Sequence, residues 1–340
     1  MTVSIDWLCL HGFTGTPTDW QPVLGRVKRL DRVGGGQAFC PTLLGHGAAV
    51  GMSKIDDGSS QATIAKPDPG RRPGLCCFVP AGTRSPSGSP SPDLGLGGPG
   101  GGQGGEGTGD VEIVSDTVDL SVAAPASPAQ NSFEAEVDRL AAWLASRTNE
   151  PVALAGYSLG GRLALGLLAR HPERFCGAVL VGCHAGLRDA AARAERRAAD
   201  EALADSLERE GIEAFVDRWQ ELPLFASQKR LPESLQAAQR ARRLAHDPSG
   251  LAASLRRVGA GAMPNLWDRL ASIEVPIALV VGELDTKFRA LGETMAQSWP
   301  AASLEIVPGA GHNVVLEAPE HVARVMGQLV LGMAPVEVCR

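Results

Sequence analysis

A serine between two glycines is the first residue of the sequence that could perform chemistry. The string GYSLG at residues 156–160 matches the pattern G-x-S-x-G, with an apolar run before it and a helical pattern after it. A strand, a sharp turn and a helix in this order expose the serine hydroxyl at the end of the strand. We therefore expect Ser158 to be catalytic, although a plain strand-to-helix turn would have the same appearance.

A serine hydroxyl needs a base that takes its proton and an acid that orients this base. In chains with this turn the order is serine, acid, histidine. Asp285 and His312 satisfy that order, and each lies in a short loop after an apolar run. Glu283 is the alternative acid, but it lies two residues nearer to the preceding run. We expect Ser158, Asp285 and His312 to form a catalytic triad.

Two backbone N–H groups are candidates for holding a developing oxyanion. One belongs to Leu159, directly after the serine, and the other to Phe13, in the loop that follows the first apolar run. Acyl-transfer and enolate chemistry both need such donors. Gly12 would let this loop approach closely, so we expect an oxyanion hole rather than an ordinary glycine turn.

Arg162 lies one helical turn after Ser158, where a general esterase has no evident need for a cation. A guanidinium group matches the planar geometry of a carboxylate and can bind it with two hydrogen bonds. The position of Arg162 therefore raises the possibility of an anionic substrate.

The elements that must position these residues alternate between apolar runs and helical patterns. This alternation predicts an α/β fold, a mostly parallel sheet with helices on both faces. Asn131 and Glu134 resemble a capping box at the start of one helix. The strand candidates are 5–10, 37–44, 151–156, 178–182, 276–282 and 303–307, and helices are expected over 133–144, 159–170 and 319–331.

Two segments interrupt the alternation. Residues 52–130 are rich in glycine and proline and have too little apolar surface to offset the entropy of ordering their backbone, so we expect a disordered insertion. Within it, residues 111–122 could form a short strand or hairpin. Residues 184–265 are helical and rich in charge, and we expect a cap over the carboxyl ends of the strands. The core then comprises residues 1–51, 131–183 and 266–340.

The composition indicates which partners and which cellular compartment to expect. A formal net charge of −6 argues against nucleic acid, which normally requires a basic face. No apolar run approaches the roughly 18 residues of a membrane helix, and the N-terminus lacks the pattern of a secretory signal. The seven cysteines follow neither metal-ligand nor disulfide spacing. We expect a cytoplasmic protein with no metal, no membrane span and no nucleic acid partner, and leave its oligomeric state open.

Several strings together resemble one family of α/β-hydrolase-fold enzymes, the MenH family of menaquinone biosynthesis. They are LHGFTGTPTDW, GYSLGGRLAL, GELDTKFRAL and GAGHNVVLEAP, extended in the cap by GLRDAAARAERRAAD, FVDRWQELPLFAS and LAASLRRVGAGAMPNLW. The resemblance covers the chain except for residues 52–130. It implies a carbon–oxygen lyase, 2-succinyl-6-hydroxy-2,4-cyclohexadiene-1-carboxylate (SHCHC) synthase, which eliminates pyruvate from an enolpyruvyl cyclohexene precursor without a metal or an organic cofactor.

The resemblance also implies roles for individual residues. Ser158, activated by His312 and Asp285, would remove a proton from the substrate ring, and the oxyanion hole would hold the enolate. The substrate, a small molecule, carries several carboxylates. The residues that the resemblance indicates for binding it are Tyr157, Arg162, Arg196, Trp219, Arg242 and Lys287, with Arg240 and Arg243 close enough to Arg242 to replace it.

Other readings stay open at this point. A carboxylesterase or a carbon–carbon bond hydrolase would use the same triad, because function in this fold depends on the site rather than on the architecture. A non-catalytic ligand-binding protein is a third hypothesis, against which the intact triad argues. The string PTLLGHG replaces the more usual DLPGHG, and residues 52–130 follow it directly. That segment could shield the site, obstruct it or represent non-coding sequence.

Overall fold

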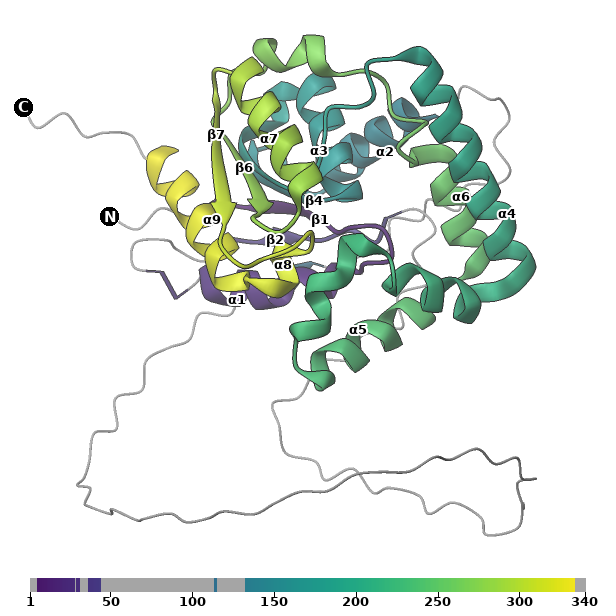
Figure 1. Ribbon diagram of the computed structural model, residues 1–340. Helices are drawn as coiled ribbons and strands as arrows, with labels where there is room; N and C mark the ends of the chain where they lie inside the picture. The colour runs from purple at the N-terminus through teal and green to yellow at the C-terminus, as the bar shows by residue number, and fades with distance from the viewer. Residues whose placement is uncertain (1–4, 28, 31–35, 44–112, 115–131, 334–340) are drawn as a thin grey trace, which may run out of the picture. The chain divides into compact units, whose positions relative to one another are not determined.

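The computed structural model describes residues 5–27, 29–30, 36–43, 113–114 and 132–333 (Figure 1). In this part of the chain, seven strands form one sheet in the order β3-β2-β1-β4-β5-β6-β7, and all neighbours are parallel. This architecture confirms the predicted α/β fold class. The strands are β1 (Trp7–Leu10), β2 (Ala38–Phe39), β3 (Ile113–Val114), β4 (Val152–Tyr157), β5 (Phe175–Val181), β6 (Ile277–Gly282) and β7 (Ala302–Val307).

Helices cover both faces of the sheet because side chains of each strand alternate between the faces. Along β1, Leu8 and Leu10 join the core under α2, α3 and α7, whereas Trp7 and Cys9 join the core under α1 and α9. Both faces are therefore apolar, which explains why the central strands read as continuous apolar runs. The helices are α1 (Gln21–Val27), α2 (Phe133–Ala145), α3 (Leu159–Arg170), α7 (Thr286–Ser298), α8 (Val314–Glu317) and α9 (Pro319–Met333).

Two local features differ from the expectations. The N-cap of α2 is Ser132, whose side chain accepts a hydrogen bond from the N–H of Ala135 at 3.2 Å, whereas Asn131 lies outside the described residues. Ile113–Val114 form β3 and confirm the short strand expected within residues 111–122, but this strand pairs with Ala38–Phe39 of the main sheet although it falls inside the expected insertion. The other residues of 52–130, and with them the predicted disorder and hairpin, lie outside the described residues.

Residues 184–265, which we call the cap segment, lie between β5 and the 3-10 helix η5 (Trp267–Ser272) that precedes β6. Buried residues of α4 and α6, including Leu207, Phe215 and Leu251, form a small core separate from the two cores at the sheet. The cap segment thus has an apolar centre of its own and packs as a unit. Its elements are α4 (Ala190–Gln220), the 3-10 helix η4 (Pro223–Arg230), α5 (Glu233–Leu244) and α6 (Pro248–Val258).

None of the helices in the described ranges combines the length and the apolar character that crossing a membrane requires.

Candidate active site

Ser158 lies in a strained turn between β4 and α3. Its backbone has φ 53° and ψ −106°, a conformation that few residues other than glycine adopt. The turn is tight on both sides, since a Cβ added to Gly156 would lie 2.6 Å from the carbonyl oxygen of Gly160. A Cβ on Gly160 would lie 2.2 Å from the carbonyl oxygen of Leu10. The two glycines of the motif therefore allow β4, α3 and β1 to approach closely enough to present the serine.

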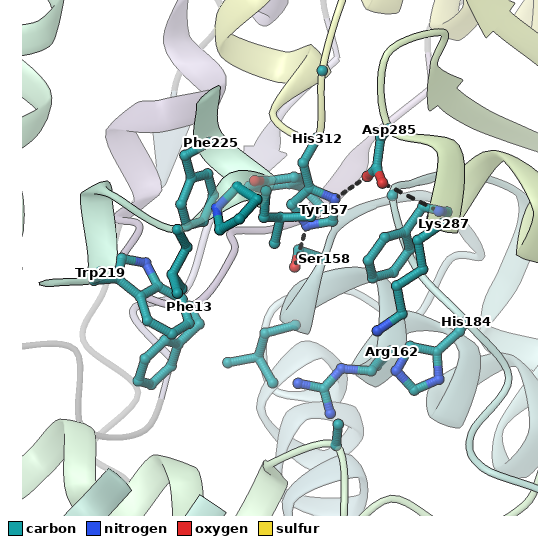
Figure 2. A pocket seen from close by; sticks show the side chains of 18 of the residues that line it. Phe13, Tyr157, Ser158, Arg162, His184, Trp219, Phe225, Asp285, Lys287 and His312 are labelled. Carbon is teal, nitrogen blue, oxygen red and sulfur yellow. Dashed lines mark hydrogen bonds and ion pairs between the residues drawn. The ribbon is translucent and has the colours of Figure 1, made fainter. Parts of the chain in front are cut away.

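Ser158, His312 and Asp285 form a continuous hydrogen-bonded chain (Figure 2). His312 Nε2 lies 3.1 Å from Ser158 Oγ, and His312 Nδ1 lies 2.6 Å from Asp285 Oδ2. Both His312 and Asp285 are buried. An ionised carboxylate can only accept, so Nδ1–H donates to Asp285 and leaves Nε2 to accept the serine proton. The arrangement can therefore activate the serine oxygen.

The backbone hydrogen bonds of the two acids explain why Asp285, rather than Glu283, contacts His312. Glu283 is exposed and accepts a hydrogen bond from the N–H of Gly309 at 2.8 Å. Asp285 is the N-cap of α7 and accepts a second hydrogen bond from the N–H of Phe288 at 3.2 Å. The start of α7 thus directs the Asp285 carboxylate toward His312, and Glu283 supports the neighbouring loop instead.

The loop after β1 brings Phe13 to the same cavity as Ser158 and Leu159. Buried His11 supports this loop, because its Nδ1 donates to the carbonyl oxygen of Gly12 at 2.9 Å and its Nε2 accepts from the N–H of Leu43 at 3.1 Å. Burial lowers the pKa of His11 to about 3, so the ring stays neutral and keeps both contacts. The structure therefore brings together the two residues whose N–H groups were expected to form an oxyanion hole.

A cavity of about 740 Å³ opens in front of Ser158. Figure 2 shows Phe13, Trp219 and Phe225 on one side of the serine and Arg162, His184 and Lys287 on the other. The sheet side supplies Ser158 and its partners, whereas the cap segment supplies much of the opposite wall. We call Phe13, Trp219 and Phe225 the aromatic half, and Arg162, His184, Arg196 and Lys287 the cationic half, of this cavity.

The rings of the aromatic half contact one another and extend to the triad. The Trp219 ring meets Phe13 edge to face at 5.3 Å, stacks on Phe215 at 5.4 Å and lies 5.7 Å from Phe225. Phe225 in turn lies edge-on to His312 at 6.2 Å. The Nε1 atom of Trp219 is buried and has no hydrogen-bond partner among the described residues. This wall can pack against an apolar ring.

The cationic half places two arginines, Arg162 and Arg196, around one carboxylate, that of Asp200. Arg162 Nη1 donates to the carbonyl oxygen of Val258 at 2.8 Å, and Arg196 Nε donates to Asp200 at 2.8 Å. The surrounding protein lowers the pKa of Arg162 to about 10, which leaves it charged at neutral pH. Lys287 reaches the cavity from the first turn of α7. Positive charge therefore exceeds negative charge on this wall, so it suits an anion.

Tyr157 also lines the cavity, beside the serine. Its ring lies 5.5 Å from that of His312, and a Cβ on Gly12 would collide with it at 2.6 Å. Burial raises the pKa of Tyr157 well above its usual value, so the phenol keeps its proton. Tyr157 thus supports both the histidine and the loop that carries Phe13.

The three neighbouring arginines of α5, among them Arg242, are not among the residues that line the cavity. The Arg242 side chain lies 3.4 Å from Asp19, and Arg240 pairs with Asp217 at 2.7 Å. Arg243 is the buried one, with its guanidinium 5.2 Å from the centre of the Phe225 ring. Each arginine is held by a different neighbour, and the neighbour of Arg242 is Asp19 of the 3-10 helix η1 (Pro17–Trp20).

His184 lines the cavity but was not expected there. It follows β5 at the sheet edge where the triad residues also follow their strands. A position shortly after a strand can indicate a site residue. No motif surrounds His184, however, so the sequence predicted only that it belongs to the cap. Burial, followed by the charges of Arg162, Lys287 and Arg196, lowers the pKa of His184 to about 3.

Among the residues that the structure describes, no group of three or more His, Cys, Asp or Glu side chains is arranged to hold a metal ion.

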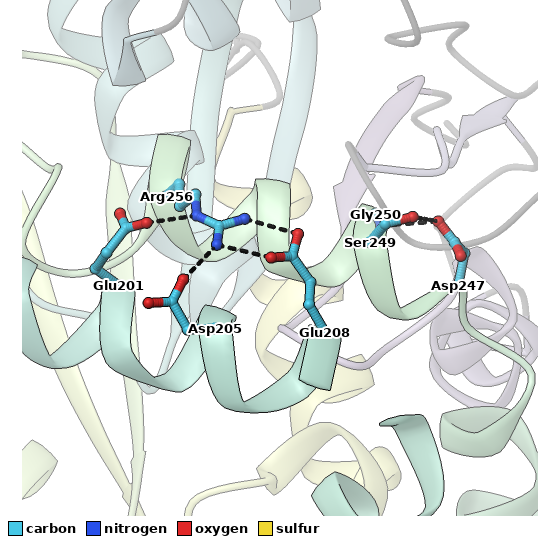
Figure 3. Close-up of polar contacts among 7 residues, drawn as sticks. All are labelled: Glu201, Asp205, Glu208, Asp247, Ser249, Gly250 and Arg256. Atoms are coloured by element: carbon cyan, nitrogen blue, oxygen red, sulfur yellow. Dashed lines mark hydrogen bonds and ion pairs between the residues drawn. The ribbon is translucent and has the colours of Figure 1, made fainter. Parts of the chain in front are cut away.

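An ion-pair network on the surface connects α4 and α6 of the cap segment (Figure 3). Arg256 of α6 contacts Glu201 at 2.6 Å, Asp205 at 2.7 Å and Glu208 at 2.8 Å, all on α4. The three carboxylates raise the pKa of Arg256. Arg196 lies on the same part of α4 as these three carboxylates, before the break in the helix at Gly211, so the network helps to fix the segment that carries Arg196.

Known proteins resemble this chain in sequence and in fold. The Alpha/beta hydrolase family matches the chain over residues 7–325. A putative SHCHC synthase of Bacillus subtilis (strain 168) is 40% identical over 207 residues, which are 61% of this chain and 74% of that protein. An SHCHC synthase of Salmonella schwarzengrund (strain CVM19633) is 35% identical over 177 residues, 52% of this chain and 67% of that protein.

Two solved structures share the fold. MenH from S. aureus has a TM-score of 0.68 and 24% identity, covering 97% of this chain and 94% of that one. A thermophilic esterase from Thermogutta terrifontis has a TM-score of 0.60 and 19% identity, covering 98% and 92%. These structures support the fold alone, whereas the sequence matches identify the family. The chain belongs to the α/β hydrolase family and, within it, to the MenH group that its sequence strings resemble.

Proposed function

We propose that this protein is an SHCHC synthase, a lyase that eliminates pyruvate from 2-succinyl-5-enolpyruvyl-6-hydroxy-3-cyclohexene-1-carboxylate in menaquinone biosynthesis. Relatives with 40% and 35% identity carry the SHCHC synthase name. The observation that carries the proposal is the position of Ser158 between an aromatic wall and a wall of basic side chains. A substrate with a six-membered ring and several carboxylates needs both walls.

In the proposed reaction Ser158 acts as a base rather than as a nucleophile. Its oxygen takes the ring proton while its own proton passes to His312 Nε2, and Asp285 stabilises the resulting imidazolium. The electrons of the broken C–H bond form an enolate, which the N–H groups of Phe13 and Leu159 stabilise. Collapse of the enolate breaks the C–O bond to the enolpyruvyl group. The departing enolpyruvate gains a proton and becomes pyruvate.

The two halves of the cavity would hold the substrate in the orientation that this step needs. Arg162, Arg196 and Lys287 would bind its carboxylates, and guanidinium groups can do so with two hydrogen bonds each. Trp219, together with Phe13, would pack against the ring. We propose that residues 184–265 act as a cap, since they supply Arg196 and Trp219, and that the reaction takes place in the cytoplasm.

Ester hydrolysis is the alternative to be excluded by experiment. Purified protein is supplied with the enolpyruvyl precursor, and pyruvate release is followed with a coupled dehydrogenase beside a protein-free control. The lyase proposal expects pyruvate far faster than in the control and slow cleavage of a neutral p-nitrophenyl ester. Pyruvate at the spontaneous rate together with rapid ester cleavage would refute it.

A further inference from the structure

His184 is held in one position by the turn that follows β5. Its Nδ1 accepts a hydrogen bond from the N–H of Gly186 at 3.0 Å. Gly186 has φ +90°, and a Cβ added there would lie 2.3 Å from the carbonyl oxygen of Pro264. Trp267 Nε1 donates to the carbonyl oxygen of Gly186 at 2.9 Å and fixes the same turn from its other side. The geometry of this backbone turn therefore makes Nδ1 of His184 a hydrogen-bond acceptor.

This contact determines where the ring carries its proton. A nitrogen that accepts an N–H bond has no proton of its own, so the neutral ring of His184 is protonated at Nε2. No described residue is a hydrogen-bond partner of Nε2, and the ring lines the cavity beside Arg162 and Lys287 (Figure 2). Nε2–H is thus a neutral donor in the cationic half that the proposed chemistry has not used.

We infer that His184 is a specificity-determining residue whose Nε2–H donates a hydrogen bond to a substrate carboxylate in the cationic half of the cavity. This role rests on the proposed function for the identity of the substrate, but requires only that an organic carboxylate binds there. The two oxygens of a carboxylate accept about four hydrogen bonds, so an arginine and a lysine leave room for a further donor.

A neutral donor has an advantage over a fourth cation at this position. Arg162, Arg196 and Lys287 already repel one another when no anion is bound, and another charge would add to that repulsion. The same three charges, together with burial, keep His184 neutral. The histidine therefore adds a directional hydrogen bond without increasing the free energy of the empty site.

Two substitutions of His184 test its Nε2–H donor separately from its Nδ1 acceptor. His184→Gln places an amide N–H near the position of Nε2, whereas His184→Asn can accept from Gly186 but is too short to reach the carboxylate. Succinate is the probe, with neutral succinamide as the matched control, and affinities are measured by calorimetry. We expect succinate to bind His184→Asn about tenfold more weakly than the wild type, and His184→Gln within about threefold of it. Succinamide should not distinguish the three proteins.

A second measurement does not depend on the variants folding. In wild-type protein with ¹⁵N-labelled histidine, the His184 ring should show the neutral Nε2–H form from pH 5.5 to 8, and its Nε2–H signal should shift when succinate is added. A doubly protonated ring at neutral pH, no binding of succinate, or equal succinate affinity in His184→Asn would each overturn the inference.

The outcomes also separate this inference from the proposed function. If pyruvate is not released but succinate binding depends on the residue at position 184, the synthase proposal fails and the carboxylate contact stands. If pyruvate is released and His184→Asn keeps the wild-type KM and succinate affinity, the contact fails and the synthase proposal stands.

Discussion

The aromatic and cationic halves of the cavity are stabilised in opposite ways. Trp219 contacts Phe13 and Phe225, with ring centres 5.3 and 5.7 Å away, so the aromatic half is held together by packing before any ligand arrives. In the cationic half, Arg162 and Arg196 lie near each other, and the Asp200 carboxylate partly offsets their charges. Like charges gathered in this way are favourable only when an anion joins them. One half thus serves folding as well as binding, and the other serves binding.

Replacement of Ser158, which lies between the halves, should have the largest effect. Ser158→Ala removes the proposed base while leaving both walls intact, so pyruvate release should fall on the order of 10⁴-fold. Succinate should still bind, because the cationic half is unchanged. Steady-state kinetics and calorimetry on the same preparation test this pair of outcomes. Activity within tenfold of the wild type would remove Ser158 from the mechanism.

A change in the cationic half should reduce binding and spare stability. Arg162→Ala should lower kcat/KM about 100-fold, since it removes a half-buried partner for a substrate carboxylate. Thermal stability should stay the same or increase, because a half-buried charge without an ion pair of its own is removed. The matched control is Arg209→Ala, whose side chain is 66% exposed and pairs with Glu210 on the surface. If Arg162→Ala unfolds readily while retaining its kinetics, the contrast between the halves is lost.

A change in the aromatic half, in contrast, should reduce the stability of the protein. Trp219→Ala leaves a gap among Phe13, Phe215 and Phe225 and should lower the free energy of unfolding by about 2 kcal/mol, measured by urea denaturation. Trp219→Phe retains most of the packing and serves as the control, while it tests the contribution of the indole N–H to KM. An alanine variant as stable as the wild type would mean that this wall contributes nothing to folding.

The neutral histidine of the cationic half should make stability sensitive to acid. The pKa of His184 is lowered from 6.5 to about 3 in the folded protein. Between these values the unfolded chain binds a proton that the folded protein does not bind, so stability declines as the pH falls from about 6.5 toward 3. His184→Gln should therefore lose less stability than the wild type between pH 7 and pH 4. Urea midpoints across this range provide the test, and equal declines would contradict it.

The smallest effect is expected far from both walls, in the ion-pair network of the cap segment. Arg256→Met should lower the melting temperature slightly, and raised salt should diminish the difference, because exposed ion pairs are screened. Kinetics should change little as long as α4 keeps its place. A large loss of activity would show that the network determines the position of Arg196.

Much of the triad could be predicted because its signals are local. The glycines around Ser158 permit a turn that few other sequences can form, and Asp285 and His312 follow apolar runs. The carboxyl ends of parallel strands lie along one edge of the sheet, so residues that follow different strands come together there. Chain order and strand ends were therefore enough to place three residues that are 154 positions apart at the extremes.

The cap segment could not be predicted to the same depth. Arg242 and Arg243 are neighbours on one helix and point about 100° apart, so a small rotation of α5 decides which one is buried. Asp19 and Phe225, from distant parts of the chain, set that rotation by contacting one arginine each. His184 had a strand end before it but no motif around it, so its place in the cavity could not be distinguished from that of an ordinary cap residue.

The sequence by itself determined the fold class, the turn that presents Ser158 and the order of its partners, because each follows from neighbouring residues or from the alternation of strands and helices. Only the tertiary structure decided which basic side chains reach the cavity, that Ile113–Val114 complete the sheet edge, and that His184 carries its proton on Nε2. These features depend on contacts between segments far apart in the chain. Tertiary packing sets the geometry of these contacts, and no pattern of neighbouring residues in the sequence predicts it.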